Sequence, residues 1–297
     1  MLAEDGIGLI GNGPQENATY LGAMSASVTA TRIIRHEAGS LAEVDDILVT
    51  EEPLEIRLGH GPVEDRKEFR LSVTMRTPGH DEELALGFLF TEGLITDAAQ
   101  VLRVEHCVNV KPEERGNVVR AELHPEVELD PDKWQRNFYT TSSCGVCGKS
   151  SIEAVHAQCL RPLAPWGAVD ATMIGALPDR MRDAQTVFKH TGGIHAAALF
   201  DRQGKLLLLR EDIGRHNAVD KVIGAALNAA LRTDDTALLV SGRAGFELVQ
   251  KCVVAGIPLM AAVGAPSSVA VDLARKSGLT LIGFLRGDRF NCYAPAE

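Results

Sequence analysis

Two cysteines in a glycine-flanked loop are the residues of this sequence best suited to chemistry. Cys144 and Cys147 stand in the segment 142–148, which reads Ser-Ser-Cys-Gly-Val-Cys-Gly. A cysteine reacts or binds metal as the thiolate, and a nearby cation or helix start lowers the pKa of its thiol. Lys149 follows the pair, and residues 150–155 have the pattern of a helix start. Zinc binding, dithiol redox chemistry and nucleophilic sulfur transfer are therefore the three hypotheses to compare.

The surroundings of the pair favour sulfur transfer over the other two. A structural zinc site needs about four ligands, and the sequence has no second C-x-x-C motif; Cys159 and Cys292 would complete a site only if folding brought them close. A thioredoxin-like dithiol follows a strand within a βαβ unit, whereas this pair lies in mid-chain after a polar stretch. Glycines and serines around the pair suit a thiolate that must visit both a donor and an acceptor. Taken alone, the motif leaves all three hypotheses open.

Two polar segments next to predicted helices are candidates for binding. Ser241, Gly242 and Arg243 lie between a predicted strand and a predicted helix, where backbone N–H groups form a ready anion site. They do not match a Walker or a dinucleotide fingerprint. Residues 211–217 precede another predicted helix, with Asn217 as the expected N-cap. Their role is either capping and salt bridging or a polar wall in which His216 helps proton transfer. His190 and His195 are expected to be structural.

The elements that position these segments divide the chain into two halves. In the first half, residues 54–58 and 70–76 alternate with period two and are expected to pair as strands, a helix begins at Asp81, and residues 118–123 form a strand. In the second half a hairpin precedes alternating helices and strands, which is typical of an α/β sheet. The elements expected there are a hairpin of 195–200 with 205–210, helices over 217–231, 246–254 and 267–276, and strands over 237–240, 258–263 and 279–285.

Composition narrows the class of protein. The chain has 297 residues, of which 45% are hydrophobic and 24% charged, the balance of a globular protein. A net charge of −10 argues against a nucleic-acid binder, which is usually basic. The N-terminal residues lack a signal-peptide pattern, and no apolar run is long enough to span a bilayer. We therefore expect a cytoplasmic protein, and six cysteines in such a protein are not a disulfide framework.

Several segments in order resemble one known family. Residues 140–148 resemble the signature of the FdhD family, the formate dehydrogenase accessory sulfurtransferases. The resemblance extends from about residue 32 to residue 293. Its other matching segments are residues 75–79, 87–93, 210–218, 241–243 and 283–286.

The resemblance implies a specific activity. Members of this family accept persulfide sulfur from a cysteine desulfurase and transfer it to the molybdenum cofactor, in its bis(molybdopterin guanine dinucleotide) form, for the formate dehydrogenase apoenzyme. Cys144 would bear the persulfide and Cys147 would assist it. The alternative is a cofactor-binding chaperone without transfer chemistry, which would not need Cys144. The resemblance also implies a homodimer and no zinc, since the sequence lacks the deaminase P-C-x-x-C element.

The resemblance also implies a fold and a binding segment. We expect an α/β protein with a flexible tail over residues 1–30, a smaller β-rich domain over 31–135, and a cytidine-deaminase-like, three-layer domain over 136–297. Residues 284–289 align with the cofactor-binding stretch of the family and follow a predicted strand, where open α/β sheets bind ligands. The residues expected to contact the cofactor are Phe284, Leu285, Arg286, Gly287, Asp288 and Arg289. Its arginines suit phosphates, its glycine permits close backbone approach, and its aspartate suits guanine.

Overall fold

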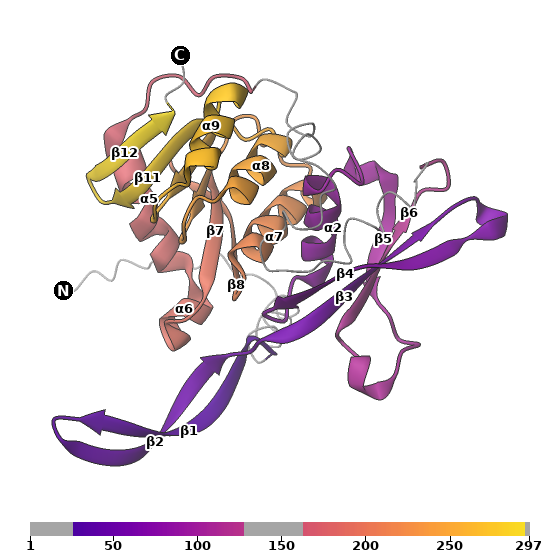
Figure 1. The fold of residues 1–297 in the computed structure, drawn as a ribbon, viewed down its shortest axis with the longest axis horizontal. Coiled ribbons are helices and arrows are strands. Elements are labelled where there is room, and N and C mark those ends of the chain that lie inside the picture. The colour runs from indigo at the N-terminus through magenta and orange to yellow at the C-terminus, as the bar shows by residue number, and fades with distance from the viewer. Residues whose placement is uncertain (1–25, 128–162, 295–297) are drawn as a thin grey trace, which may run out of the picture.

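The structure, a computed structural model of the chain, describes residues 26–127 and 163–294. These residues form a two-stranded ribbon, a four-stranded sheet and a six-stranded sheet. Figure 1 shows how the ribbon and the two sheets are arranged. The mixture of helices with a smaller N-terminal and a larger C-terminal sheet confirms the predicted α/β class. The predicted domain boundary at residues 135–136 lies outside the described residues. None of the described helices is long and apolar enough to cross a membrane.

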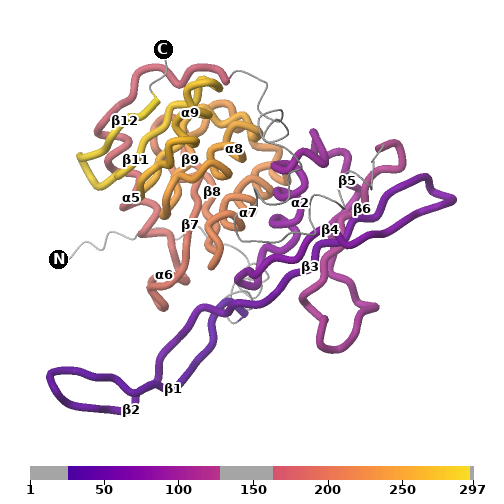
Figure 2. The backbone as a smooth tube through the Cα atoms, viewed as in Figure 1, coloured from indigo at the N-terminus to yellow at the C-terminus, as the bar shows by residue number. Residues whose placement is uncertain are grey.

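The ribbon is formed by β1 (Val28–Glu37) and β2 (Ser40–Val49). Its strands pair without interruption from Val28 opposite Val49 to Glu37 opposite Ser40. The two-residue turn between them has positive φ at both residues, as a tight hairpin with the native twist requires. β1 begins within the range predicted to be a flexible tail. The ribbon, residues 28–49, is called the arm below, because it extends away from the rest of the molecule (Figure 2).

The four-stranded sheet has the strand order β4-β3-β6-β5. Its strands are β3 (Glu52–His60), β4 (Lys67–Arg76), β5 (Val101–His106) and β6 (Val118–Leu123). Helix α2 (Asp81–Thr91) packs its Leu84 and Leu89 against alternate residues of β3, including Leu54 and Ile56. The predicted pairing of residues 54–58 with 70–76 is confirmed. Short 3-10 turns lie between these elements at Val63–Asp65, Ala98–Gln100 and Pro112–Glu114.

The six-stranded sheet has the strand order β12-β11-β10-β9-β7-β8. Its strands are β7 (His195–Phe200), β8 (Leu206–Asp212), β9 (Ala237–Val240), β10 (Leu259–Ala262), β11 (Thr280–Arg286) and β12 (Arg289–Ala294). β9, β10 and β11 are parallel, and β7 is antiparallel to both β8 and β9. The carboxyl ends of β8, β9, β10 and β11 therefore meet at one edge of the sheet.

Helices cover both faces of this sheet. Helices α7 (Arg215–Asn228), α8 (Phe246–Val254) and α9 (Ser268–Ser277) contribute to one core cluster. Helix α5 (Ala171–Ala184) packs Ile174 and Leu177 into a second cluster on the other face, and α6 (Thr186–Thr191) follows it. The three layers predicted for this half are confirmed. Sequence reasoning missed β5, β12, α5, α6 and the pairing of β1 with β2.

Two glycines let the halves of the molecule approach closely. α2 packs against α7, and the two helices lie side by side in Figure 1. A Cβ atom on Gly87 would lie 1.9 Å from the backbone oxygen of Asp220, and one on Gly224 would lie 1.9 Å from the backbone oxygen of Glu83. Any other residue would force these backbones apart, so the glycines fix the distance between the two halves.

Buried ion pairs hold the same junction. Lys251 of α8 donates hydrogen bonds to Asp220 at 3.0 Å and to Glu92 at 3.0 Å. Burial would lower the pKa of Lys251, but the charges of these two carboxylates raise it. A second pair joins Lys221 to Asp212 at 2.7 Å, with the Lys221 ammonium also donating to the carbonyl of Thr77. The contact of Lys251 with Glu92 and that of Lys221 with Thr77 each join the two halves, so buried ammonium groups hold the two sheets together.

A candidate anion-binding rim

The candidate site lies at the edge where the carboxyl ends of β8, β9, β10 and β11 meet. We call it the rim and define it as His195, residues 213–216, 241–245 and 264–267, and Phe284. Cys144 and Cys147 lie outside the described residues. Of the other predicted site residues, the structure brings Ser241, Gly242, Arg243 and Phe284 to the rim.

The loop between β9 and α8 is anchored to the start of β7. Ser241 donates its N–H to the carbonyl of Ala196, and its hydroxyl oxygen accepts the N–H of Ala196 at 2.9 Å. The Ser241 hydroxyl also lies 3.3 Å from Nδ1 of His195. Gly242 follows between His195 and Arg215: a Cβ there would lie 3.4 Å from the imidazole and 3.6 Å from Cδ of Arg215. The loop therefore places a histidine and an arginine on either side of the half-buried backbone of Gly242.

The loop between β10 and α9 packs directly against the first loop. Gly264 donates its N–H to the carbonyl of Gly242 at 3.0 Å, and its own carbonyl accepts the N–H of Phe284. A Cβ on Gly264 would lie 2.9 Å from that Gly242 oxygen, so glycine is required at this close approach. Sequence reasoning did not single out Gly264. The sequence feature that could have identified Gly264 is its position just after a buried strand, where open α/β sheets carry their ligand-binding loops.

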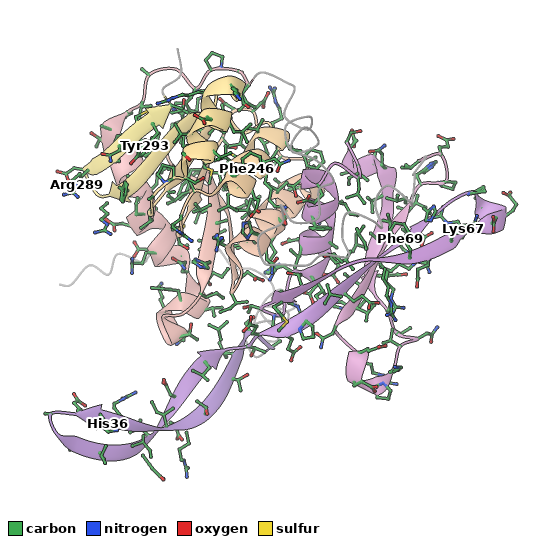
Figure 3. All side chains as sticks on the ribbon, in the orientation of Figure 1. His36, Lys67, Phe69, Phe246, Arg289 and Tyr293 are labelled. Carbon is green, nitrogen blue, oxygen red and sulfur yellow. The ribbon has the colours of Figure 1, made fainter. Side chains whose placement is uncertain are left out.

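The segment predicted to bind the cofactor, residues 284–289, divides into parts with different surroundings. Phe284 is 41% exposed and has a φ of 54°, a left-handed conformation that is uncommon for a bulky residue. Leu285 is fully buried in the second core cluster, so its side chain cannot reach an external ligand. Arg286, Gly287, Asp288 and Arg289 are exposed in the β11–β12 turn, and Arg289 lies at its outer end (Figure 3).

The base of that turn rests on α5. A Cβ on Gly175 would lie 2.6 Å from the backbone oxygen of Gly287, so the helix approaches the turn at a glycine. Within the described part of the chain, neither Arg286 nor Arg289 has a carboxylate partner. The two arginines are opposite each other in the strand register, at the end of β11 and the start of β12, with Asp288 in the turn between them.

The segment 211–217 separates into structural residues and rim residues. The prediction that Asn217 caps the helix is wrong, because the helix begins at Arg215 with Gly214 as its N-cap. Asn217 is buried inside the first turn, where its amide donates to Asp212 and to the carbonyl of Met75. Glu211 accepts N–H groups at the start of α6. The carboxylates of Glu211 and Asp212 and the amide of Asn217 are therefore engaged in hydrogen bonds that stabilise the fold.

Arg215 and His216 are the members of this segment that reach the rim. His216 lies 2.6 Å from a carboxylate oxygen of Glu247, in the first turn of α8. Both side chains are half-buried. This pair ties the start of α7 to the start of α8.

The electrostatics of the rim favour an anion. Among the described residues, Arg215 and Arg243 have no carboxylate within ion-pair distance. The starts of α7 and α8 have glycine N-caps that make no side-chain capping hydrogen bond, and the positive end of each helix dipole lies at the rim. Burial, reinforced by the charge of Arg215, lowers the pKa of His195, which keeps this imidazole neutral near pH 7. The arrangement suits phosphate groups held by arginine and backbone N–H donors.

Other residues in the family-like segments lie at the junction of the two halves. Arg76 is buried and pairs with both oxygens of Asp81, at 3.0 and 2.9 Å. Thr77 bonds Asp212 through its N–H and Ile213 through its hydroxyl. Arg210 donates to Glu83 across the junction. Thr77 and Arg210 therefore hold the halves together, whereas Arg76 pairs within the first half, and none of the three belongs to the rim.

A cleft of about 390 Å³ lies beside the start of α2. Two of its charged groups satisfy each other, since Arg76 binds Asp81, and Nε2 of His106 lies 3.4 Å from the same carboxylate, whereas Nδ1 of His106 is buried without a hydrogen-bond partner. No group of three or more potential metal ligands occurs in residues 26–127 and 163–294. The cleft is therefore assigned no ligand. Its lining residues are Ala26, Glu52, Arg76, Pro78, Gly79, His80, Asp81, Glu82, His106 and Gly116.

Comparisons with known proteins agree on one family. The model of the FdhD/NarQ family matches residues 49–297, beginning at the last residue of β2. A protein of Streptomyces coelicolor named sulfur carrier protein FdhD is 49% identical over 271 residues, covering 90% of this chain and 93% of that protein. A protein of the same name from Mycobacterium tuberculosis is 50% identical over 279 residues, covering 91% of this chain and 98% of that protein.

A solved structure shares the fold. The crystal structure of a protein from Desulfotalea psychrophila, described as a formate dehydrogenase accessory protein, superposes with a TM-score of 0.68. The match covers 91% of this chain and 98% of that one, at 24% sequence identity. The similarity therefore extends over the arm-bearing half and the large sheet together, rather than over one common motif.

Proposed function

Because this chain belongs to the FdhD/NarQ family, we propose that it is a sulfur carrier that transfers persulfide sulfur to a molybdenum cofactor. In this proposal a cysteine desulfurase loads sulfur onto Cys144, and Cys147 assists. The acceptor is the bis(molybdopterin guanine dinucleotide) form of the cofactor, bound as cargo. The final recipient is a formate dehydrogenase apoenzyme, and the work is done in the cytoplasm by a homodimer.

The observation that supports cargo binding is the charge of the rim. Two arginines without carboxylate partners, Arg215 and Arg243, and two helix starts without side-chain caps surround the backbone of Gly242. A guanine dinucleotide carries a pyrophosphate, and arginine with backbone N–H donors is the usual protein surface for such a group. Arg286 and Arg289 extend the positive surface beyond β11, and Asp288 supplies an acceptor for guanine.

Sulfur transfer is supported by the cysteine motif and by the names of the relatives. Cys144 lies between serine and glycine and is close to Lys149, whose charge favours the thiolate. The relatives that match most of this chain are named sulfur carrier proteins. The rim itself contains no cysteine among the described residues. The proposal therefore separates two tasks: the cysteine motif carries sulfur, and the rim holds the acceptor.

Two measurements test the two tasks independently. The purified chain is expected to bind guanosine diphosphate, the end group of the cargo, by isothermal titration calorimetry. Cells in which Cys144→Ala replaces the native chain are expected to lose formate dehydrogenase activity, although the variant binds the nucleotide normally. Full dehydrogenase activity with Cys144→Ala would refute sulfur transfer and leave the alternative, a cofactor-binding chaperone. Absence of nucleotide binding in the native chain would refute the role of the rim.

A further inference from the structure

His195 shares the centre of the rim with Arg215. Its half-buried side chain extends from the first residue of β7. A Cβ on Gly242 would lie 3.4 Å from Cε1 of His195, 3.5 Å from its Nδ1 and 3.6 Å from Cδ of Arg215. The imidazole and the arginine side chain therefore converge on the same short stretch of backbone.

That stretch of backbone has hydrogen-bond donors to offer. Within residues 26–127 and 163–294, the N–H groups of Gly242 and Arg243 donate to no acceptor, whereas the carbonyl of Gly242 accepts the N–H of Gly264. The peptide between Gly242 and Arg243 is trans, so its N–H points away from the carbonyl that Gly264 occupies. An anion bound to these N–H groups adjoins His195 and Arg215, because both side chains contact the same glycine.

Ser241 suits either protonation state of the imidazole. Its hydroxyl oxygen accepts the N–H of Ala196 at 2.9 Å and lies 3.3 Å from Nδ1 of His195. A hydroxyl has one proton to donate and two lone pairs. It can therefore donate to Nδ1 of a neutral imidazole, or accept from Nδ1 of an imidazolium while its own proton turns to a bound anion. A carboxylate in the same place would favour the charged ring.

The charged groups around His195 keep it neutral while the rim is empty. Burial lowers the pKa of His195 most, followed by the charge of Arg215, and His216 of the same helix adds a smaller effect. Asp212, which lies opposite His195 in the strand register, acts in the other direction. Asp212 is buried and lies 2.7 Å from the Lys221 ammonium, so its charge is compensated within the fold.

We propose that His195 is an anion-binding residue coupled to a proton: it takes one proton from solvent when a phosphate group binds at the rim, and its imidazolium then holds that group together with Arg215 and Arg243. The inference rests on the proposed binding of a nucleotide-bearing cargo at the rim. A negative charge within about 4–6 Å stabilises the charged form of an imidazole. Binding and release of the cargo are thereby coupled to pH through one side chain.

The direction of the coupling follows from the two protonation states. The empty chain holds His195 neutral down to a lowered pKa, and a bound anion raises that pKa. Between the two pKa values, binding consumes up to one proton. The dissociation constant therefore falls as pH decreases through the pKa of the complex, by at most about tenfold per pH unit, and is constant below the pKa of the empty chain.

Guanosine diphosphate mannose is the probe for this coupling. Its pyrophosphate is esterified at both ends, so it lacks the phosphate proton that titrates near about pH 6 in a free nucleotide. Isothermal titration calorimetry of the full chain at about pH 6.5, in two non-phosphate buffers of different ionisation enthalpy, measures the protons exchanged. We expect uptake of about 0.3 to 1 proton per nucleotide, and binding about three- to tenfold tighter at about pH 6 than at about pH 8.

His195→Gln removes the titrating group and keeps a side chain that forms hydrogen bonds. The variant is expected to bind the probe as the native chain does at about pH 8, and about three- to tenfold more weakly than the native chain at about pH 6, with proton uptake near zero. His36→Gln, which changes an exposed histidine of the arm, is the matched control and is expected to keep the native uptake.

Nuclear magnetic resonance of the native chain gives a second measurement that needs no variant. The imidazole resonance of His195, assigned through bonds to its own backbone, is expected to titrate at a higher pH when the probe is present, whereas that of His36 is unchanged. Binding without proton uptake, or native uptake in His195→Gln, overturns the role of His195 and leaves nucleotide binding intact. A native chain that does not bind the probe at any pH refutes the proposed function of the rim, and the coupling with it.

Discussion

Arg215 and Arg243 show what residue types alone leave undecided. Both are arginines in polar loops, as are many surface residues, and the sequence singled out Arg243 because a strand and a helix flank it. Arg215 was part of a cluster that also contained Glu211, Asp212 and Asn217. The side chains of these three residues are engaged in hydrogen bonds at helix starts and in the interior. Only the contacts distinguish the residues that face the rim from those that hold the fold, and those contacts join positions far apart in the chain.

Arg243→Ala is expected to weaken binding of guanosine diphosphate by about ten- to a hundredfold, the usual effect of losing a charge-assisted hydrogen bond. Isothermal titration calorimetry measures the change. Arg232→Ala is the matched control, because Arg232 is exposed and already paired with Asp234 at 2.7 Å. Equal losses in the two variants would indicate an effect of net charge rather than a site at the rim.

The burial of His195 makes stability depend on pH. Burial, and then the charge of Arg215, lowers its pKa, so the unfolded chain binds this proton more readily than the folded chain. The free energy of unfolding should therefore fall as pH drops through the ordinary histidine range, near 6.5, toward the lowered pKa of the folded state. Urea unfolding between about pH 8 and pH 5.5 is expected to show a smaller fall for His195→Gln than for the native chain.

His60, whose pKa burial also lowers, should leave part of the pH dependence in that variant. His36→Gln, which changes an exposed residue of the arm, is the control. A pH dependence that is identical in the native chain and in His195→Gln would show that the imidazole is not held neutral by its surroundings.

At the scale of elements, periodicity predicted the strands and helices whose patterns are regular. The pairing of β3 with β4, the hairpin of β7 with β8, and helices α8 and α9 were found in this way. Helix α5 was missed because Gly175 and Pro178 interrupt its pattern, although it packs firmly in the second core cluster. Gly175 is there for the close approach to Gly287, a contact across more than a hundred residues that local propensity does not contain.

The crossing of α2 and α7 gives a stability prediction. Gly224→Ala is expected to lower the free energy of unfolding by about 1–3 kcal/mol or more, because the added Cβ would meet the backbone oxygen of Glu83 and force the helices apart. Gly193→Ala is the control, since the nearest atom to a Cβ there is 3.7 Å away. Chemical denaturation measures both, and equal stability of the two variants would contradict the close crossing.

The buried ammonium of Lys251 gives a second stability prediction. Lys251→Met removes the cation between Asp220 and Glu92 and is expected to cost about 3–5 kcal/mol, the usual effect of leaving a buried charge without its partner. Lys251→Met with Asp220→Asn should recover part of this loss, because less negative charge is then left buried.

Lys67→Met serves as the control, because Lys67 and its partner Asp65 are largely exposed and such pairs contribute at most about 1 kcal/mol. A loss no larger in Lys251→Met than in Lys67→Met would show that the junction does not depend on this ion pair.

At the scale of the whole molecule, the family-like segments have two kinds of role. Residues 75–79 and 87–93 lie at the junction of the two halves, whereas residues 241–243 and 283–286 lead to the rim. The resemblance identified the family correctly from these segments taken together. The resemblance did not separate the two roles. In one sequence, a residue that the junction requires cannot be told apart from a residue that binds a ligand. The arm, whose strands precede most of the matching segments, was not predicted.

The molecule as a whole has two halves joined by buried contacts and a charged rim, and the cysteine motif lies between the two halves in the sequence. The central claim is that Cys144 receives sulfur and that the rim holds the acceptor. The most direct test is peptide mass spectrometry of the purified chain after incubation with a cysteine desulfurase and cysteine. We expect an added sulfur atom on Cys144, which is absent when the desulfurase is omitted and lost on reduction. A native chain that gains no sulfur on Cys144 under these conditions would contradict it.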